Sequence, residues 1–148
     1  AKTGNPAGID FPRPMLDSGD YKFSFSGIKT AVRYFVDKAR AAKTPFLIED
    51  VAASFQAAVV DVLVQKTIRA AKERGAQAIT LTGGVAANSQ LRDSMDRAAK
   101  ELGVKMFYPP IALCTDHAAM IAGIAYHKYK QGIRDGLNLN ASATGSIV

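Results

Sequence analysis

Two adjacent glycines, Gly83 and Gly84, stand between a short apolar run and a stretch with helical periodicity. Glycine tolerates positive φ angles and lets a ligand approach the main chain closely. Asn88 and Ser89, which follow, are both plausible N-caps for the next helix. The start of a helix offers free N–H groups and a positive dipole end to a phosphate. This pattern is typical of a phosphate-binding turn, and also of an ordinary strand-to-helix connection.

A second polar group lies downstream, where Asp116 and His117 are expected in the first turn of a helix capped by Thr115. In open α/β sheets, ligands gather beyond the carboxyl ends of the strands. One pocket could therefore contain both Asp116 and the glycine turn. Asp116 is either an oxygen ligand for a metal cation or an acid that only stabilises the helix start. His117 would point in a different direction, so a two-residue chelate is not expected.

The other potentially reactive side chains give weaker indications of a functional site. Lys29 follows the Ser24–Ser26 turn, where it could bind a phosphate or simply be a solvated helix lysine. No histidine is placed to serve as the base for a serine nucleophile. The single cysteine, Cys114, cannot form an internal disulfide and is expected to be a small buried residue. A reducing, cytoplasmic setting is the natural one for such a chain.

The elements that must position these residues follow from periodicity. Alternation over Tyr21–Ser26 predicts a half-buried strand. A strand, a helix and a second strand over 77–108 favour a parallel pair with a right-handed connection. Helices are expected from Ile28 to before Thr44, and over about 48–74, 89–102 and 115–130; the strands after the first are expected near 77–82 and 104–108.

Composition sets broad limits. The chain has 148 residues, 48% of them hydrophobic, which suits one compact domain with a real core. Its net charge of +6 is compatible with an RNA partner but identifies none. Gln56, Asp61 and Gln65 interrupt the most apolar stretch, so a membrane helix and a membrane partner are not expected.

Three stretches taken together resemble one family: Phe23–Thr30, Gly83–Asn88 and Tyr108–Asp116, in this order and spacing. They are similar to the universal tRNA threonylcarbamoyladenosine transferases, long named O-sialoglycoprotein endopeptidases or glycoproteases. The similarity runs from about residue 9 to 131, and the Leu-Cys-Thr-Asp wording resembles the bacterial branch. The chain looks like the C-terminal half of a family member.

The resemblance implies an α/β fold, the C-terminal lobe of an actin-like ATPase (ribonuclease H-like), with a mixed sheet packed with helices. This lobe would span 21–132, after an irregular lead-in over 1–20 from a preceding lobe and before a flexible tail over 133–148. The implied enzyme moves a threonylcarbamoyl group from threonylcarbamoyl-adenylate to N6 of the adenosine 3′ of the anticodon, in tRNAs reading codons that begin with A. Bacterial members are expected to work with a paralogous scaffold subunit and a small ATPase.

The family's functional residues carry over at four positions. Asn88 matches the asparagine that contacts the adenylate, and Gly83 and Gly84 match the turn on the phosphate side. Asp116 matches one ligand of a divalent metal, iron or zinc, whose other ligands are two histidines of a His-x-x-x-His motif upstream of this sequence. The chain alone is therefore expected to be inactive. His117 departs from the family, which usually has asparagine there, and could add or merely replace a hydrogen bond.

Three alternatives stay open at this point. A metalloprotease would agree with the older family name, but the sequence lacks the paired histidines and glutamate of a zinc protease. A non-catalytic scaffold paralogue would have no need to keep Asp116 and Asn88. Another kinase with the actin-like fold would be distinguished by turnover of ATP with a sugar.

Overall fold

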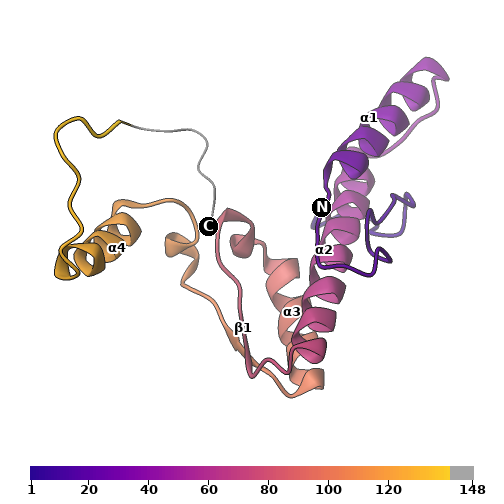
Figure 1. Ribbon diagram of the computed structural model, residues 1–148. Coiled ribbons are helices and arrows are strands. Elements are labelled where there is room, and N and C mark those ends of the chain that lie inside the picture. Colours follow the sequence, from indigo (N-terminus) through magenta and orange to yellow (C-terminus); the bar gives the residue numbers. More distant parts are fainter. Residues whose placement is uncertain (141–148) are drawn as a thin grey trace. The chain divides into compact units, whose positions relative to one another are not determined.

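The computed structural model describes residues 1–140, which divide into two compact units, Ala1–Cys114 and the chain from Thr115 onward. The part of the expected tail over 141–148 lies outside the described residues. The α/β class predicted from the sequence is confirmed. The first unit contains α1 (Ser26–Ala41), α2 (Ile48–Glu73), β1 (Ala78–Thr80), the 3-10 turn η1 (Gly84–Ala87), α3 (Ser89–Leu102), β2 (Lys105–Phe107) and the 3-10 turn η2 (Ile111–Leu113); the second contains α4 (Ala118–Lys130) (Figure 1).

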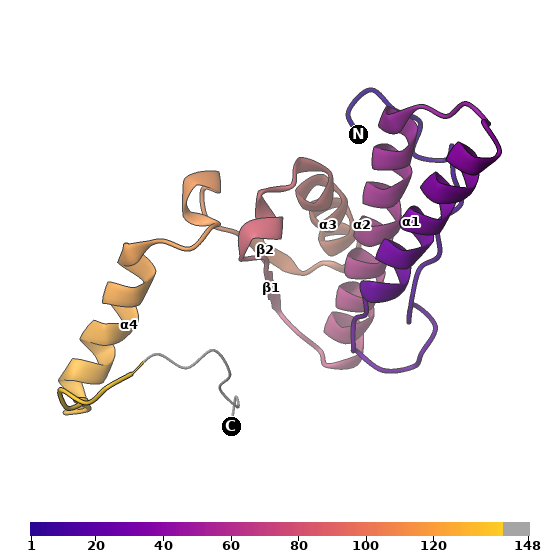
Figure 2. The ribbon, with the colours of Figure 1, turned by 90° about the horizontal axis from the view of Figure 1, so that it is seen from above.

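Helix α2 is the central element of the first unit, with α1 beside it on one side and α3 on the other (Figure 2). Its N-terminal half packs against α1 through a cluster that includes Val51, Ala58 and Ile28. From Val60 onward, α2 packs against α3 and the strands, in a cluster that includes Met95. Glu49 and Asp50 in the first turn and Lys72 in the last complement the helix dipole. The helix expected from Ile28 to before Thr44 and the helices expected over about 48–74 and 89–102 are confirmed.

The two strands form a parallel pair, in which Ile79 lies opposite Met106. α3 makes the crossover between them, and Gly103, at φ 76°, ends that helix in the left-handed conformation. Ile79 and Met106 both pack against the helices. The predicted strand–helix–strand unit is therefore confirmed, and it brings the carboxyl ends of β1 and β2 to the same edge.

The strand predicted over Tyr21–Ser26 is wrong. This stretch forms no strand, and Ser26 already belongs to α1. The rings of Phe23 and Phe25 do lie on one side, with centroids 6.2 Å apart, which is what the alternation detected. Within residues 1–140, however, no strand pairs with this stretch. The carbonyl groups of Asp20 and Lys22 accept hydrogen bonds from side chains of α2 instead.

By length and composition, α2 is long and apolar enough to cross a membrane, contrary to the expectation from its polar interruptions. Nearly half of its most apolar window is buried inside the unit. Its polar residues are also bound internally: Asp61 forms an ion pair with Arg13, and the Ser54 hydroxyl accepts a hydrogen bond from the Ile9 amide. These contacts are typical of a core helix rather than of a membrane span.

The last helix begins later than predicted. α4 starts at Ala118, and its N-cap is His117, whose Nδ1 accepts a hydrogen bond from the Met120 amide at 3.3 Å. Thr115 is therefore not the cap, and Asp116 lies before the helix rather than in its first turn. The imidazole performs here the capping role that an asparagine side chain can perform, because both offer an acceptor to an N–H of the first turn. Gly132, at φ 78°, follows the end of α4.

Candidate functional site

The glycine turn lies directly beyond the carboxyl end of β1. Gly83 has φ 88° and ψ 170°, a conformation that is essentially restricted to glycine. Gly84 does not have a positive φ, and a Cβ at either position would meet nothing within 4 Å. Both residues are exposed. The backbone conformation therefore requires glycine at position 83. At position 84 neither the backbone angles nor neighbouring atoms require glycine, and its absence of a side chain leaves the main chain exposed.

Asn88 joins the turn to two helices. Its Oδ1 accepts a hydrogen bond from the Leu91 amide at 2.9 Å, which makes Asn88, not Ser89, the N-cap of α3. Its Nδ2 donates to Gln56 Oε1 on α2 at 2.9 Å, and Gln56 in turn binds Gln90. The carboxamide is thus held in one orientation by both of its ends. The capping role is confirmed, and one N–H of the amide group is left for a ligand.

Arg92 ties the glycine turn to the segment after β2. Its guanidinium donates to the carbonyl groups of Ala86 and Pro109 and lies 3.0 Å from Cys114 Sγ. It also stacks on the ring of Tyr108, with 4.4 Å between the guanidinium carbon and the ring centroid. Cys114 is buried, as predicted. One side chain therefore fixes the spacing between the loops that follow the two parallel strands.

Tyr108 makes a second contact with α3, a hydrogen bond to Asp96. Its hydroxyl donates to Asp96 Oδ2 at 2.9 Å. This hydrogen bond, together with the negative charge of Asp96, raises the pKa of Tyr108 above its ordinary value of 10.0. The phenol therefore stays neutral at physiological pH and serves as a donor and as a stacking surface for Arg92.

Asp116 lies in the second unit and is exposed. Within residues 1–140, no three His, Cys, Asp or Glu side chains are grouped so as to hold a metal ion. A catalytic metal site usually has three protein ligands, so these residues do not make a complete site for the metal that the resemblance implies. The shared pocket expected for Asp116 and the glycine turn stays a prediction.

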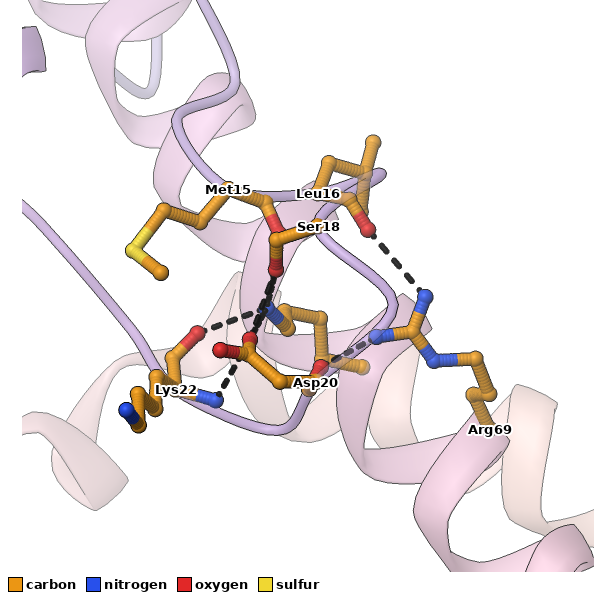
Figure 3. Close-up of polar contacts among 7 residues, drawn as sticks. Met15, Leu16, Ser18, Asp20, Lys22 and Arg69 are labelled. Carbon is orange, nitrogen blue, oxygen red and sulfur yellow. Dashed lines mark hydrogen bonds and ion pairs between the residues drawn. The ribbon is translucent and has the colours of Figure 1, made fainter.

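A buried cationic cluster, which the periodicity of the sequence did not predict, holds the irregular segment before α1. Lys66 of α2 is 1% exposed, and its ammonium group donates to Met15 O and Lys22 O, both at 2.6 Å, and to Ser18 Oγ at 2.9 Å. Arg69, one turn further along, donates to the carbonyl groups of Leu16 and Asp20 (Figure 3). A lysine inside an apolar helical stripe was the available signal for such a cluster.

Taken together, these features define an α/β domain with an exposed glycine turn between a parallel strand and an asparagine-capped helix. Residues 1–123 match the tRNA N6-adenosine threonylcarbamoyltransferase family. The chain belongs to this family. It is 50% identical over 147 residues to a protein of that name from Thermotoga neapolitana, and 48% and 46% identical over 141 residues to those of Thermosipho africanus and Clostridioides difficile.

These three relatives are longer proteins. The matches cover 99%, 95% and 95% of this chain but 44%, 42% and 42% of the relatives. The chain thus spans about two fifths of their length. All three motifs on which the family resemblance rests lie inside the region 1–123 that matches the family.

Proposed function

We propose that this chain supplies part of the active site of a transferase that attaches a threonylcarbamoyl group to N6 of the adenosine 3′ of the anticodon in tRNA. The observation that carries the proposal is the exposed Gly83–Gly84 turn next to Asn88, in a chain that belongs to the threonylcarbamoyltransferase family. The donor would be threonylcarbamoyl-adenylate. In the reaction, N6 attacks the carbonyl carbon of the mixed anhydride, the bond from that carbon to the phosphate oxygen breaks, and AMP leaves while N6 loses a proton.

The turn would receive the phosphate side of the adenylate. Gly84 presents uncovered main chain to which a ligand can come within hydrogen-bond distance. Asn88 would use the remaining N–H of its amide, because Leu91 and Gln56 already hold the rest of the group in place. A donor fixed in this way loses little entropy when the ligand binds. The fold proposed for the complete lobe is the C-terminal lobe of an actin-like ATPase, with a mixed sheet larger than β1 and β2.

Asp116 would contribute one carboxylate oxygen to a divalent metal, iron or zinc, whose other ligands would come from outside this chain. One carboxylate holds a divalent cation weakly. Titration of this chain with zinc or iron in a calorimeter should therefore show no tight stoichiometric binding. Tight binding that disappears in Asp116→Ala would mean that the chain builds a full metal site, and would contradict this assignment. From membership of the transferase family we also propose the partners of the chain. They are tRNA, a paralogous scaffold subunit and a small ATPase, and the reaction would take place in the cytoplasm.

The sharpest test is a chimera, because the relatives extend beyond the part that this chain matches. The 147-residue segment of the Thermotoga neapolitana relative that aligns with this chain would be replaced by this chain, and transfer of threonylcarbamoyl to tRNA measured with the adenylate as donor. The expected result is transfer by the chimera and its loss in the Asn88→Ala version. A folded chimera without transfer, beside an active parent, would contradict the proposal.

A further inference from the structure

The positive charge of the protein is concentrated on one helix and its two ends. Residues 22–43 contain six basic residues and one acid, Asp37, so they carry +5 of the chain's net charge of +6. The rest of the chain carries a net charge of only +1. All six basic residues are exposed: Lys22, Lys29, Arg33, Lys38, Arg40 and Lys43. Within residues 1–140, Asp37 is the only carboxylate paired with any of them, through Arg33 at 3.6 Å.

Three of these cations form a row along α1. At 100° per residue, Lys29, Arg33 and Arg40 fall within about 40° of arc, and at 1.5 Å per residue the row extends over roughly 16 Å. Ile28 and Ala39, which are buried in the core, lie roughly 80 to 140° away from this row around the helix. The cationic row therefore borders the packed side of α1, and all three of its side chains are exposed and available to a partner.

A tyrosine and a hollow lie next to Arg33, further around the exposed side of α1. Tyr34 is 73% exposed. Together with Thr30, Arg33 and Asp37 it lines a hollow of about 370 Å³. An aromatic ring next to a guanidinium is a surface on which an unpaired nucleic-acid base can stack, and flanking cations can contact the phosphates on either side of that base.

We infer that this face of α1, the α1 surface (Lys29, Arg33, Tyr34 and Arg40), binds the phosphate backbone and an unpaired base of the RNA substrate. The inference rests on the proposed function, in which the substrate is tRNA, and it adds where the RNA lies on this chain. An RNA loop fits these residues better than an acidic protein does, because the surface offers an exposed aromatic ring and an adjacent hollow as well as charge.

The test compares two variants that remove equal charge. One carries Lys29→Gln, Arg33→Gln and Arg40→Gln; the control carries Lys2→Gln, Lys72→Gln and Lys100→Gln, at exposed positions outside α1. Binding of a transcribed tRNA with adenosine 3′ of its anticodon would be measured over a series of salt concentrations. Each lost phosphate contact should reduce the slope of log K against log salt by roughly 0.7 to 0.9. The α1 variant should therefore lose about 2 to 3 from the slope and roughly tenfold in affinity, and the control much less.

Tyr34→Ser provides a second readout, because it should weaken tRNA binding with little change in the salt slope. Equal losses in both triple variants would overturn the inference, since any surface charge would then suffice. Unchanged tRNA binding by the α1 variant, with reduced binding of polyglutamate, would also overturn it in favour of an acidic protein partner. Absence of tRNA binding by the unaltered chain together with an inactive chimera would defeat the proposed function as well, whereas an active chimera would leave that function standing and remove only the α1 surface.

Discussion

The ammonium group of Lys66 lies 3.3 Å from Asp20 Oδ1, in an ion pair that joins the middle of α2 to the irregular segment before α1. The lysine side chain is fully buried, whereas the aspartate is partly exposed. Ser18 completes the link, because its hydroxyl donates to Asp20 and accepts from Lys66. Met15, which has φ 60° in spite of its side chain, also turns its carbonyl group toward Lys66. The cluster thus holds a strained segment against the core.

Lys66→Met should destabilise the protein by about 2 to 4 kcal/mol, because it leaves the carbonyl groups of Met15 and Lys22 and the charge of Asp20 without their common donor. The measurement is urea unfolding followed by circular dichroism. Lys72→Met, at an exposed position on the same helix, serves as the control and should change stability by no more than about 0.5 kcal/mol. Equal effects of the two substitutions would mean that the buried cluster contributes nothing specific.

The same cluster predicts a dependence of stability on acid. The hydrogen bond from the Ser18 hydroxyl, followed by those from the Lys22 amide and Lys66, lowers the pKa of Asp20 below its ordinary value of 3.8, against the opposing effect of burial. A carboxyl whose folded pKa is depressed stabilises the fold above its unfolded pKa, and this contribution is lost as pH falls through the folded pKa. Melting temperatures measured from neutral pH down to below 3.8 should therefore fall less steeply for Asp20→Asn than for the unaltered chain. Asp17→Asn removes the same charge at an exposed neighbouring position and serves as the control; equal effects of the two substitutions would contradict the role of the cluster.

Gly83 and Gly84 form a matched pair for separating backbone strain from ligand contact. Gly83→Ala should destabilise the fold by about 1 to 3 kcal/mol, because alanine is strained at φ 88° and ψ 170°. Gly84→Ala should leave the unfolding free energy nearly unchanged, since its Cβ would point into open space. If the turn binds the adenylate, Gly84→Ala should nevertheless weaken transfer in the chimera. Full transfer by Gly84→Ala would show that no ligand approaches the main chain there.

Tyr108 should titrate late. Because Asp96 raises the pKa of Tyr108 above 10.0, the stabilising contribution of their hydrogen bond is fully present below about pH 10 and is lost as pH rises through the folded pKa. The ultraviolet absorbance of phenolate should show this step in the difference between the unaltered chain and Tyr108→Phe. In Asp96→Ala the same step should move to lower pH. A step at an unchanged pH would show that Asp96 does not control the phenol.

Local signals in the sequence were sufficient for much of the fold. Helices α1, α2 and α3 were predicted from the periodicity of residues close together in the chain, and they are confirmed, as is the parallel pair of strands that α3 connects. The N-cap at Asn88 is of the same kind, because a capping side chain and its N–H lie three residues apart. The motifs that resemble the transferase family are likewise short and local, so they indicate the family without any knowledge of long-range contacts.

The predictions that failed concerned residues whose partners lie far away in the sequence. The alternation over Tyr21–Ser26 is real, but whether it becomes a strand depends on a neighbouring strand. The carbonyl group of Lys22 accepts a hydrogen bond from Lys66 instead, and that of the preceding residue Asp20 accepts one from Arg69. The start of α4 depended on which of Thr115 and His117 supplies the cap, and both residue types can accept the same N–H. The tertiary structure alone placed Gln56 against Asn88 and Arg92 between two loops. Periodicity in the sequence indicates which face of a helix or strand is apolar. The partner of a polar group, in contrast, is decided by which distant segment packs beside it.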